Sequence, residues 1–265
     1  MKAWMAVGLL SLSLWGQGYA NDTVIHGSYA NGCFAGGVTI PIRGIGYEQV
    51  RPSRARNYGD AALLSLIEHL GQFAKTQQTT VILGDMSQAH GGRMPYGHAS
   101  HQIGLDVDIW FERVGAAGLQ PNEKESLDTP SLVNAKTGQV VNWQPYYRDL
   151  LHQAAMYPQT ERIFVNPVIK AHLCATEKDP SWLYKIRPWF GHDSHFHVRL
   201  KCPKNQPHCV PQAPVAKTSG CDADLNNWIK DQQDIALGLK KPSGNKKAPQ
   251  KPAMPKACET ILLNR

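Results

Sequence analysis

The chain has 265 residues, 42% of them hydrophobic, and a formal net charge of +7 at pH 7. This length can bury one sizeable core or two small ones, and we expect one domain with long loops. Six lysines and no acidic residue fall between 240 and 256, so the basicity belongs mainly to a Lys- and Pro-rich tail. Such a tail is either a solvated segment or a weak anchor to an anionic surface. No nucleic-acid motif occurs, and no nucleic-acid partner is expected.

Residues 1–20 have the features of a secretory signal peptide. They contain Lys2, an apolar stretch from Ala6 to Trp15, and the small-x-small triplet Gly18-Tyr19-Ala20. This arrangement predicts export with cleavage after residue 20, and an uncleaved anchor is the alternative. No later segment is apolar enough to span a bilayer, so we expect no membrane span after signal cleavage.

The remaining chain alternates helical and strand patterns. Residues 21–57 are rich in glycine and predict irregular coil with one short strand. Asp60 is expected to cap a helix that runs to about Gln77. Residues 112–144 form a polar stretch without periodicity, which could wall a cleft. Further helices are expected over 146–156, 166–179 and 221–239, with strands over 80–84 and 162–165.

Two segments alternate polar and apolar residues as half-buried strands do. Residues 105–111 place Asp106, Asp108 and Trp110 on one face and apolar side chains on the other. Residues 195–200 do the same, with a polar face made of His195, His197 and Arg199. The apolar faces should pack on the core, which leaves two polar faces for a site.

A metal site is the chemistry that these polar faces favour. Six of the eleven histidines lie in two windows, 90–101 and 192–197. An HxH pair alone is weak, because alternating histidines on a half-exposed strand need no metal, but Asp106 and Asp108 follow the first window closely and Asp193 lies in the second. We predict Zn²⁺ held by His101, Asp108 and His197, since three nitrogen and oxygen ligands leave the fourth position open, as in catalytic zinc sites. The motif HExxH and a credible serine nucleophile are absent.

The other residues of the two windows receive roles from their positions. His195, two residues from a ligand on the same face, is expected to act as general base and then general acid. His192 is expected to hydrogen-bond the oxyanion of the reacting carbonyl. His98 is either an additional metal ligand or a partner that orients His101. Asp106 could orient a ligand, bind a substrate amine or serve structure alone.

The six cysteines predict three disulfides, because the chain is expected to be exported. Spacing favours only one pair, Cys202 with Cys209, which would close a short loop. The pairing of the other four cysteines stays open on spacing alone.

Two long motifs carry a family resemblance. GHASHQIGLDVDIW at 97–110 and RPWFGHDSHFHVRLKCP at 187–203 resemble the LAS metallopeptidases, which are named for lysostaphin, D-Ala-D-Ala metallopeptidases and sonic hedgehog. More closely, they resemble the penicillin-insensitive murein endopeptidase family. The resemblance implies an α+β, LAS/hedgehog-like fold in which a small antiparallel sheet carries the zinc site, flanked by helices and disulfide-tied loops. It also implies the pairs Cys33 with Cys258 and Cys174 with Cys221, and it matches the base role of His195.

The implied function is hydrolysis of D-alanyl to meso-diaminopimelyl cross-links in peptidoglycan by a zinc-activated water in the periplasm, by a protein that could be a homodimer. The expected division is a signal peptide at 1–20, a metallopeptidase domain at 21–239 and a tail at 240–265 tied back at Cys258. Two alternatives stay open: a zinc D,D-carboxypeptidase that trims uncross-linked stems, and a non-catalytic wall-binding protein that keeps the metal site.

Overall fold

The computed structural model describes residues 23–242 and 251–263. The expected signal peptide at 1–20 and residues 243–250 and 264–265 of the expected tail lie outside the described residues.

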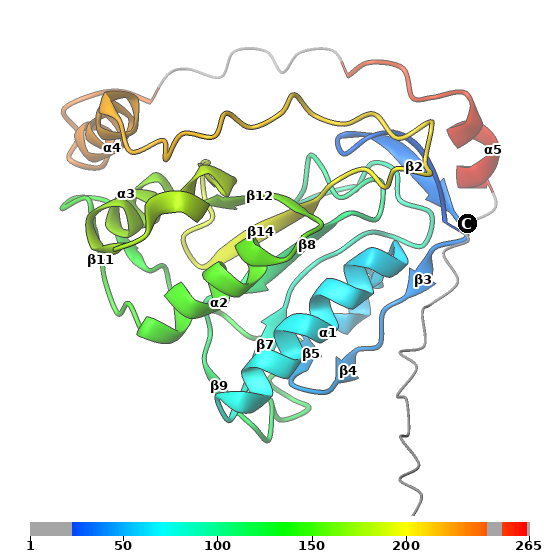
Figure 1. The fold of residues 1–265 in the computed structure, drawn as a ribbon, viewed down its shortest axis with the longest axis horizontal. Helices are drawn as coiled ribbons and strands as arrows, with labels where there is room; N and C mark the ends of the chain where they lie inside the picture. The colour runs from blue at the N-terminus through cyan, green and yellow to red at the C-terminus, as the bar shows by residue number, and fades with distance from the viewer. Residues whose placement is uncertain (1–22, 243–250, 264–265) are drawn as a thin grey trace, which may run out of the picture.

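One mixed sheet forms the body of the molecule, and the α+β class is confirmed (Figure 1). Its strands are β4 (Arg43–Gly44), β5 (Tyr47–Gln49), β7 (Thr79–Leu83), β8 (Asp106–Trp110), β9 (Val114–Gly115), β12 (Thr160–Val165), β13 (Ile186–Pro188) and β14 (His195–Leu200). The spatial order is β13-β12-β14-β8-β7-β5-β4, with β9 beside β7. Each of the middle strands β12, β14, β8 and β7 is antiparallel to its neighbour in this series. The pairs β12–β13 and β5–β7 are parallel, and the edge pair β4–β5 is antiparallel. The two expected site-bearing strands therefore lie side by side at the centre of the sheet.

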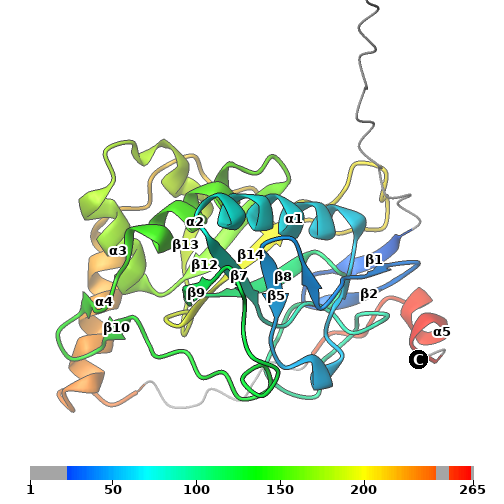
Figure 2. The ribbon, with the colours of Figure 1, turned by 90° about the horizontal axis from the view of Figure 1, so that it is seen from below.

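Two helices, α1 (Ala61–Thr76) and α2 (Pro145–Met156), lie together over one face of this sheet (Figures 1 and 2). The side chain of Asp60 accepts a hydrogen bond from the backbone N–H of Ala62, which is the N-cap that the sequence predicts. The other expected helices are present as α3 (Pro167–Thr176) and α4 (Ala223–Ala236). Helix α5 (Ala257–Leu263) and the 3₁₀-helices η1 (Pro52–Arg54) and η2 (Pro180–Lys185) complete the described helices.

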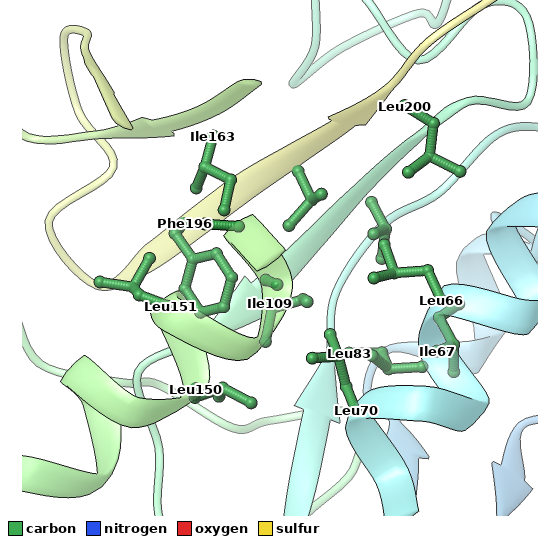
Figure 3. Packing of buried hydrophobic residues seen from close by; sticks show 14 of the residues in the cluster. Leu66, Ile67, Leu70, Leu83, Ile109, Leu150, Leu151, Ile163, Phe196 and Leu200 are labelled. Carbon is green, nitrogen blue, oxygen red and sulfur yellow. The ribbon is translucent and has the colours of Figure 1, made fainter. Parts of the chain in front are cut away.

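The core fills the space between these helices and the sheet (Figure 3). Phe196 of β14 and Ile109 of β8 face each other in register and pack with Leu70 and Leu151 of the covering helices. Each such side chain contributes about 1.5–3 kcal/mol when it is fully buried. Because the apolar faces of β8 and β14 are committed to this core, their polar faces lie on the side of the sheet opposite α1 and α2.

The expectation for residues 21–57 was wrong, because this segment contains five strands instead of one. β1 (Val24–Ser28) and β2 (Asn31–Ala35) form a hairpin, β3 (Val38–Thr39) pairs with β6 (Tyr58–Gly59), and β4 and β5 join the main sheet. Strands of two to five residues are too short to show a period. Gly32 also interrupts the alternation of polar and apolar side chains. This position requires glycine, because a Cβ there would lie 2.5 Å from the carbonyl oxygen of His26.

The three disulfides pair as expected: Cys33–Cys258, Cys174–Cys221 and Cys202–Cys209. The first bond holds α5 against β2. The polar stretch 112–144 contains only the short strands β9, β10 (Val133–Asn134) and β11 (Gln139–Val140). Among the described residues, no helix combines the length and the apolarity that crossing a bilayer requires.

Candidate metal centre

The pairing of β8 with β14 assembles the polar face. His197 lies opposite Asp108, Arg199 opposite Asp106, and His195 opposite Trp110. These cross-strand pairs confirm the alternation that the sequence predicts.

His101 reaches this face from the loop before β8. Its backbone is left-handed, with φ at 65°, a conformation that non-glycine residues seldom adopt. Two hydrogen bonds hold it there: its N–H donates to Asp106 Oδ2 at 3.0 Å, and its carbonyl accepts from the Ser87 hydroxyl. The turn directs the fully buried imidazole of His101 toward Asp108 and His197.

Three ligand atoms form a nearly equilateral triangle. His101 Nε2 lies 3.2 Å from His197 Nδ1 and 3.4 Å from Asp108 Oδ1, and His197 Nδ1 lies 3.4 Å from Asp108 Oδ1. Ligands placed about 2.0–2.1 Å from a tetrahedral zinc are separated by about 3.3–3.4 Å. Asp108 Oδ1 is buried and has no hydrogen-bond partner among the described residues, which is costly for a carboxylate unless a cation satisfies it. The donor set and its spacing therefore fit a zinc ion.

Asp106 is the partner that orients His197. Its Oδ1 accepts from His197 Nε2 at 2.8 Å and from Arg199 Nε at 2.7 Å. Because a carboxylate only accepts, His197 Nε2 carries the proton and Nδ1 presents its lone pair to the triangle. Burial would raise the pKa of Asp106, but the charge of Arg199 and the hydrogen bond from His197 outweigh it and hold that pKa well below its usual range. Burial lowers the pKa of His197 to about 3, which keeps the ring in the neutral form that binds metals.

His98 lies at the edge of the same cluster. One ligand atom from each of His98, His101 and Asp108 lies within 4.8 Å of the others, so these residues form a second possible triad. However, His98 Nε2 is 3.0 Å from Asp85 Oδ2 and 3.5 Å from Asp108 Oδ2. A nitrogen that donates to Asp85 has no lone pair to offer a metal, and this geometry favours the triangle with His197.

Asp85 is a site residue that sequence reasoning missed. It lies two residues after the end of β7 and contacts Arg54 and Arg56 as well as His98. Burial would raise the pKa of Asp85, but the hydrogen bonds from His98 and Arg56 lower it to about 2. In the sequence, the sign of this residue was an aspartate just after a predicted buried strand. Its contact with His98 depends on the conformation of the loop that carries the histidine.

His195 and His192 line the other side of the cluster. His195 Nε2 lies 3.9 Å from Asp108 Oδ2, and its ring centroid lies 5.1 Å from that of His192. His192 Nδ1 is 2.7 Å from the carbonyl oxygen of Phe190, so Nδ1 donates there. Burial, followed by the neighbouring His195, lowers the pKa of His192. The fold thus brings together all six residues that the sequence singled out.

A groove of about 700 Å³ opens over this face of the sheet. Its wall includes Trp189 and Phe190, which are 54% and 66% exposed, whereas Trp182 belongs to the core. Residues 112–144 contribute nothing to the described lining of this groove, whereas Gly138, Gln139 and Val140 line a separate pocket beside α3. The groove is lined by Ala30, Gly97, His98, Ala99, Ser100, Arg162, Phe164, Arg187, Pro188, Trp189, Phe190, His192, His197, Arg199, Gln212 and Trp228.

Fold and site together define an α+β protein with a candidate histidine and aspartate metal centre in an open groove. The model of the penicillin-insensitive murein endopeptidase family matches residues 25–263, and the chain belongs to this family.

Curated relatives named penicillin-insensitive murein endopeptidase agree with this assignment. The Haemophilus influenzae protein is 41% identical over 243 residues, which cover 89% of this chain and 81% of the relative. The Yersinia enterocolitica protein is 38% identical over 282 residues, which cover 100% and 98%. The Escherichia coli protein is 39% identical over 247 residues, which cover 89% and 85%.

Proposed function

We propose that the chain is a zinc-dependent murein endopeptidase of the periplasm that hydrolyses D-alanyl to meso-diaminopimelyl cross-links. The observation that carries the proposal is the triangle of His101 Nε2, Asp108 Oδ1 and His197 Nδ1, with edges of 3.2–3.4 Å, beside a groove in a member of this peptidase family. The periplasmic location rests on the signal-like residues 1–20 and on the substrate, murein, that the relatives' names state.

A zinc ion held by these three residues would supply Lewis-acid chemistry, which makes a water nucleophilic near neutral pH. Asp106 fixes the His197 ring so that its proton stays on Nε2, away from the triangle. His195 Nε2 faces the triangle, where it would take a proton from the attacking water and return it to the leaving amine.

The position of His192 sets a condition on its proposed role. Its Nδ1 proton is used by the Phe190 carbonyl, so Nε2 can donate to an oxyanion only when the ring is doubly protonated. His98 is proposed as an orienting residue, because its contact with Asp85 fixes its ring beside His101; their ring centroids lie 4.3 Å apart.

A defined-substrate assay tests the proposal. The mature protein, with bound metal verified, is incubated with purified cross-linked muropeptide dimers and with monomeric pentapeptides. We expect dimers to be cleaved to monomers. Release of D-alanine from pentapeptides alone would indicate a carboxypeptidase, and no turnover of either substrate would indicate a wall-binding protein.

A further inference from the structure

The polar face of the sheet continues beyond the metal centre along the groove. On β12, Phe164 lies opposite His197 and Arg162 lies opposite Arg199. On β13, Arg187 lies opposite Phe164. Since neighbouring strands are about 4.8 Å apart, Arg187 stands about 10 Å from His197, measured across the sheet. Phe164 lies between them, with its ring centroid 5.2 Å from that of His197.

These arginines differ in their partners. Arg199 is paired with Asp106 through Nε and Nη2. Arg162 Nη2 donates hydrogen bonds to the Glu161 carboxylate and to the Ala213 carbonyl oxygen. Its buried Nε has no hydrogen-bond partner in the part of the chain that is described. For Arg187, no hydrogen bond or ion pair is found within the described ranges 23–242 and 251–263.

The surroundings of Arg187 are positively charged. Arg162 and Arg187 lie in the same groove wall, and no carboxylate is among the described lining residues. Burial, followed by the charge of Arg162, lowers the pKa of Arg187. Asp222, which caps α4 by accepting from the Leu225 N–H, acts in the opposite sense, but no ion pair joins it to Arg187 among the described residues. A half-buried guanidinium in such a place costs free energy until an anion joins it.

We propose that Arg187, assisted by Arg162, binds a free carboxylate in the interior of the stem peptide, at the groove wall two strands from His197. Guanidinium groups hold carboxylates through paired, charge-assisted hydrogen bonds. The interior of the stem, away from its C-terminal carboxylate, offers two sources of this chemistry, the α-carboxylate of its γ-linked glutamate and the free carboxylate of diaminopimelate. This contact makes the enzyme prefer peptides with a free carboxylate at that position over amidated peptides. The inference rests on the proposed function.

The test uses the metal-loaded protein and three dimers: one with all carboxylates free, one amidated at glutamate and one amidated at diaminopimelate. We expect Arg187→Gln to raise KM for the free dimer at least about tenfold, with kcat changed less than about threefold. With the parent protein, one of the two amidated dimers should show the same rise in KM. Arg187→Gln should not raise the KM for that dimer any further. Arg187→Lys should be intermediate, and Arg43→Gln, which removes an exposed charge at the opposite edge of the sheet, should match the parent.

An unchanged KM in Arg187→Gln, or a rise of equal size on all three dimers, would overturn the proposal. Thermal unfolding of each variant shows whether it is folded. Arg162→Gln serves as the second variant, and we expect it to raise KM by a smaller factor than Arg187→Gln. Calorimetric binding of an uncleaved stem tetrapeptide separates this proposal from the proposed function. If no dimer is cleaved, loss of tetrapeptide affinity in Arg187→Gln still supports the carboxylate site, and unchanged affinity refutes it.

Discussion

Two aspartates on one strand face do different work. Asp108 lies at the triangle with an unpartnered oxygen, whereas both oxygens of Asp106 accept hydrogen bonds from His197, Arg199 and His101. They are two residues apart, yet the partner strand gives them opposite environments, because Asp106 faces an arginine and Asp108 faces a histidine.

Substitutions at this face should separate metal binding from catalysis. Asp108→Ala removes a proposed ligand, so we expect bound zinc to fall well below one equivalent, measured by elemental analysis. His195→Ala should keep one equivalent and lower kcat by about 100-fold or more. His69→Ala, at an exposed position on α1, is the control and should change neither quantity. Full zinc occupancy in Asp108→Ala would remove that residue from the ligand set, and near-normal turnover in His195→Ala would refute its base role.

Lys170 gives a pH prediction away from the metal centre. Its buried Nζ donates to the carbonyls of Leu183 and Ser219, and burial, followed by the charge of Arg187, lowers its pKa from 10.5 to about 7. Between pH 7 and 10.5 the unfolded chain therefore binds more protons than the folded chain, and stability rises with pH in this window. Relative to Lys170→Met, the parent should gain a few kcal/mol of unfolding free energy between pH 7 and 10, measured by urea denaturation. Parallel curves for the two proteins would contradict this.

At residue scale, alternation was enough to place Asp106, Asp108, His195 and His197 on one side of the sheet, because side-chain direction in a strand follows from sequence alone. Asp85 and Arg187 could not be found in this way. Their relation to the site depends on a loop conformation and on the parallel pairing of β12 with β13, which local sequence does not encode.

At the scale of elements, long periodic helices were predictable and short strands were not. Asp60 and the apolar stripe mark α1 within a residue or two. The hairpin of β1 and β2 has no comparable signal, since its glycines are selected by close backbone packing and interrupt the pattern.

The segment that ends in α4 is held by one disulfide. Cys174–Cys221 joins α3 to the residue before the N-cap of α4, and Trp228 of α4 lines the groove. From loop length, this bond contributes about 4 kcal/mol and Cys202–Cys209 about 2.5 kcal/mol. We expect the double variant Cys174→Ala/Cys221→Ala to unfold at lower temperature than Cys202→Ala/Cys209→Ala and to show a higher KM for dimers. Equal melting points or an unchanged KM would show that α4 is held by packing alone.

At the scale of the molecule, the two faces of one sheet divide the work. Helices α1 and α2 cover one face (Figure 2) and bury the core. The other face carries the candidate metal centre, beside which the groove opens. The C-terminal part of the chain places α4 and α5 at opposite ends of the molecule (Figure 1), with disulfides at both ends. The resemblance carried by the two motifs implied the fold class, but this division depends on long-range pairing.

The most direct test of the central claim is digestion of purified peptidoglycan by the mature protein, with and without a chelator and with zinc added back. Products are separated by chromatography and identified by mass. The metal-centre assignment predicts loss of cross-linked dimers, blocked by chelation and restored by zinc, and no loss with His195→Ala. Unchanged muropeptides with zinc bound, or cleavage that persists after complete metal removal, would contradict it.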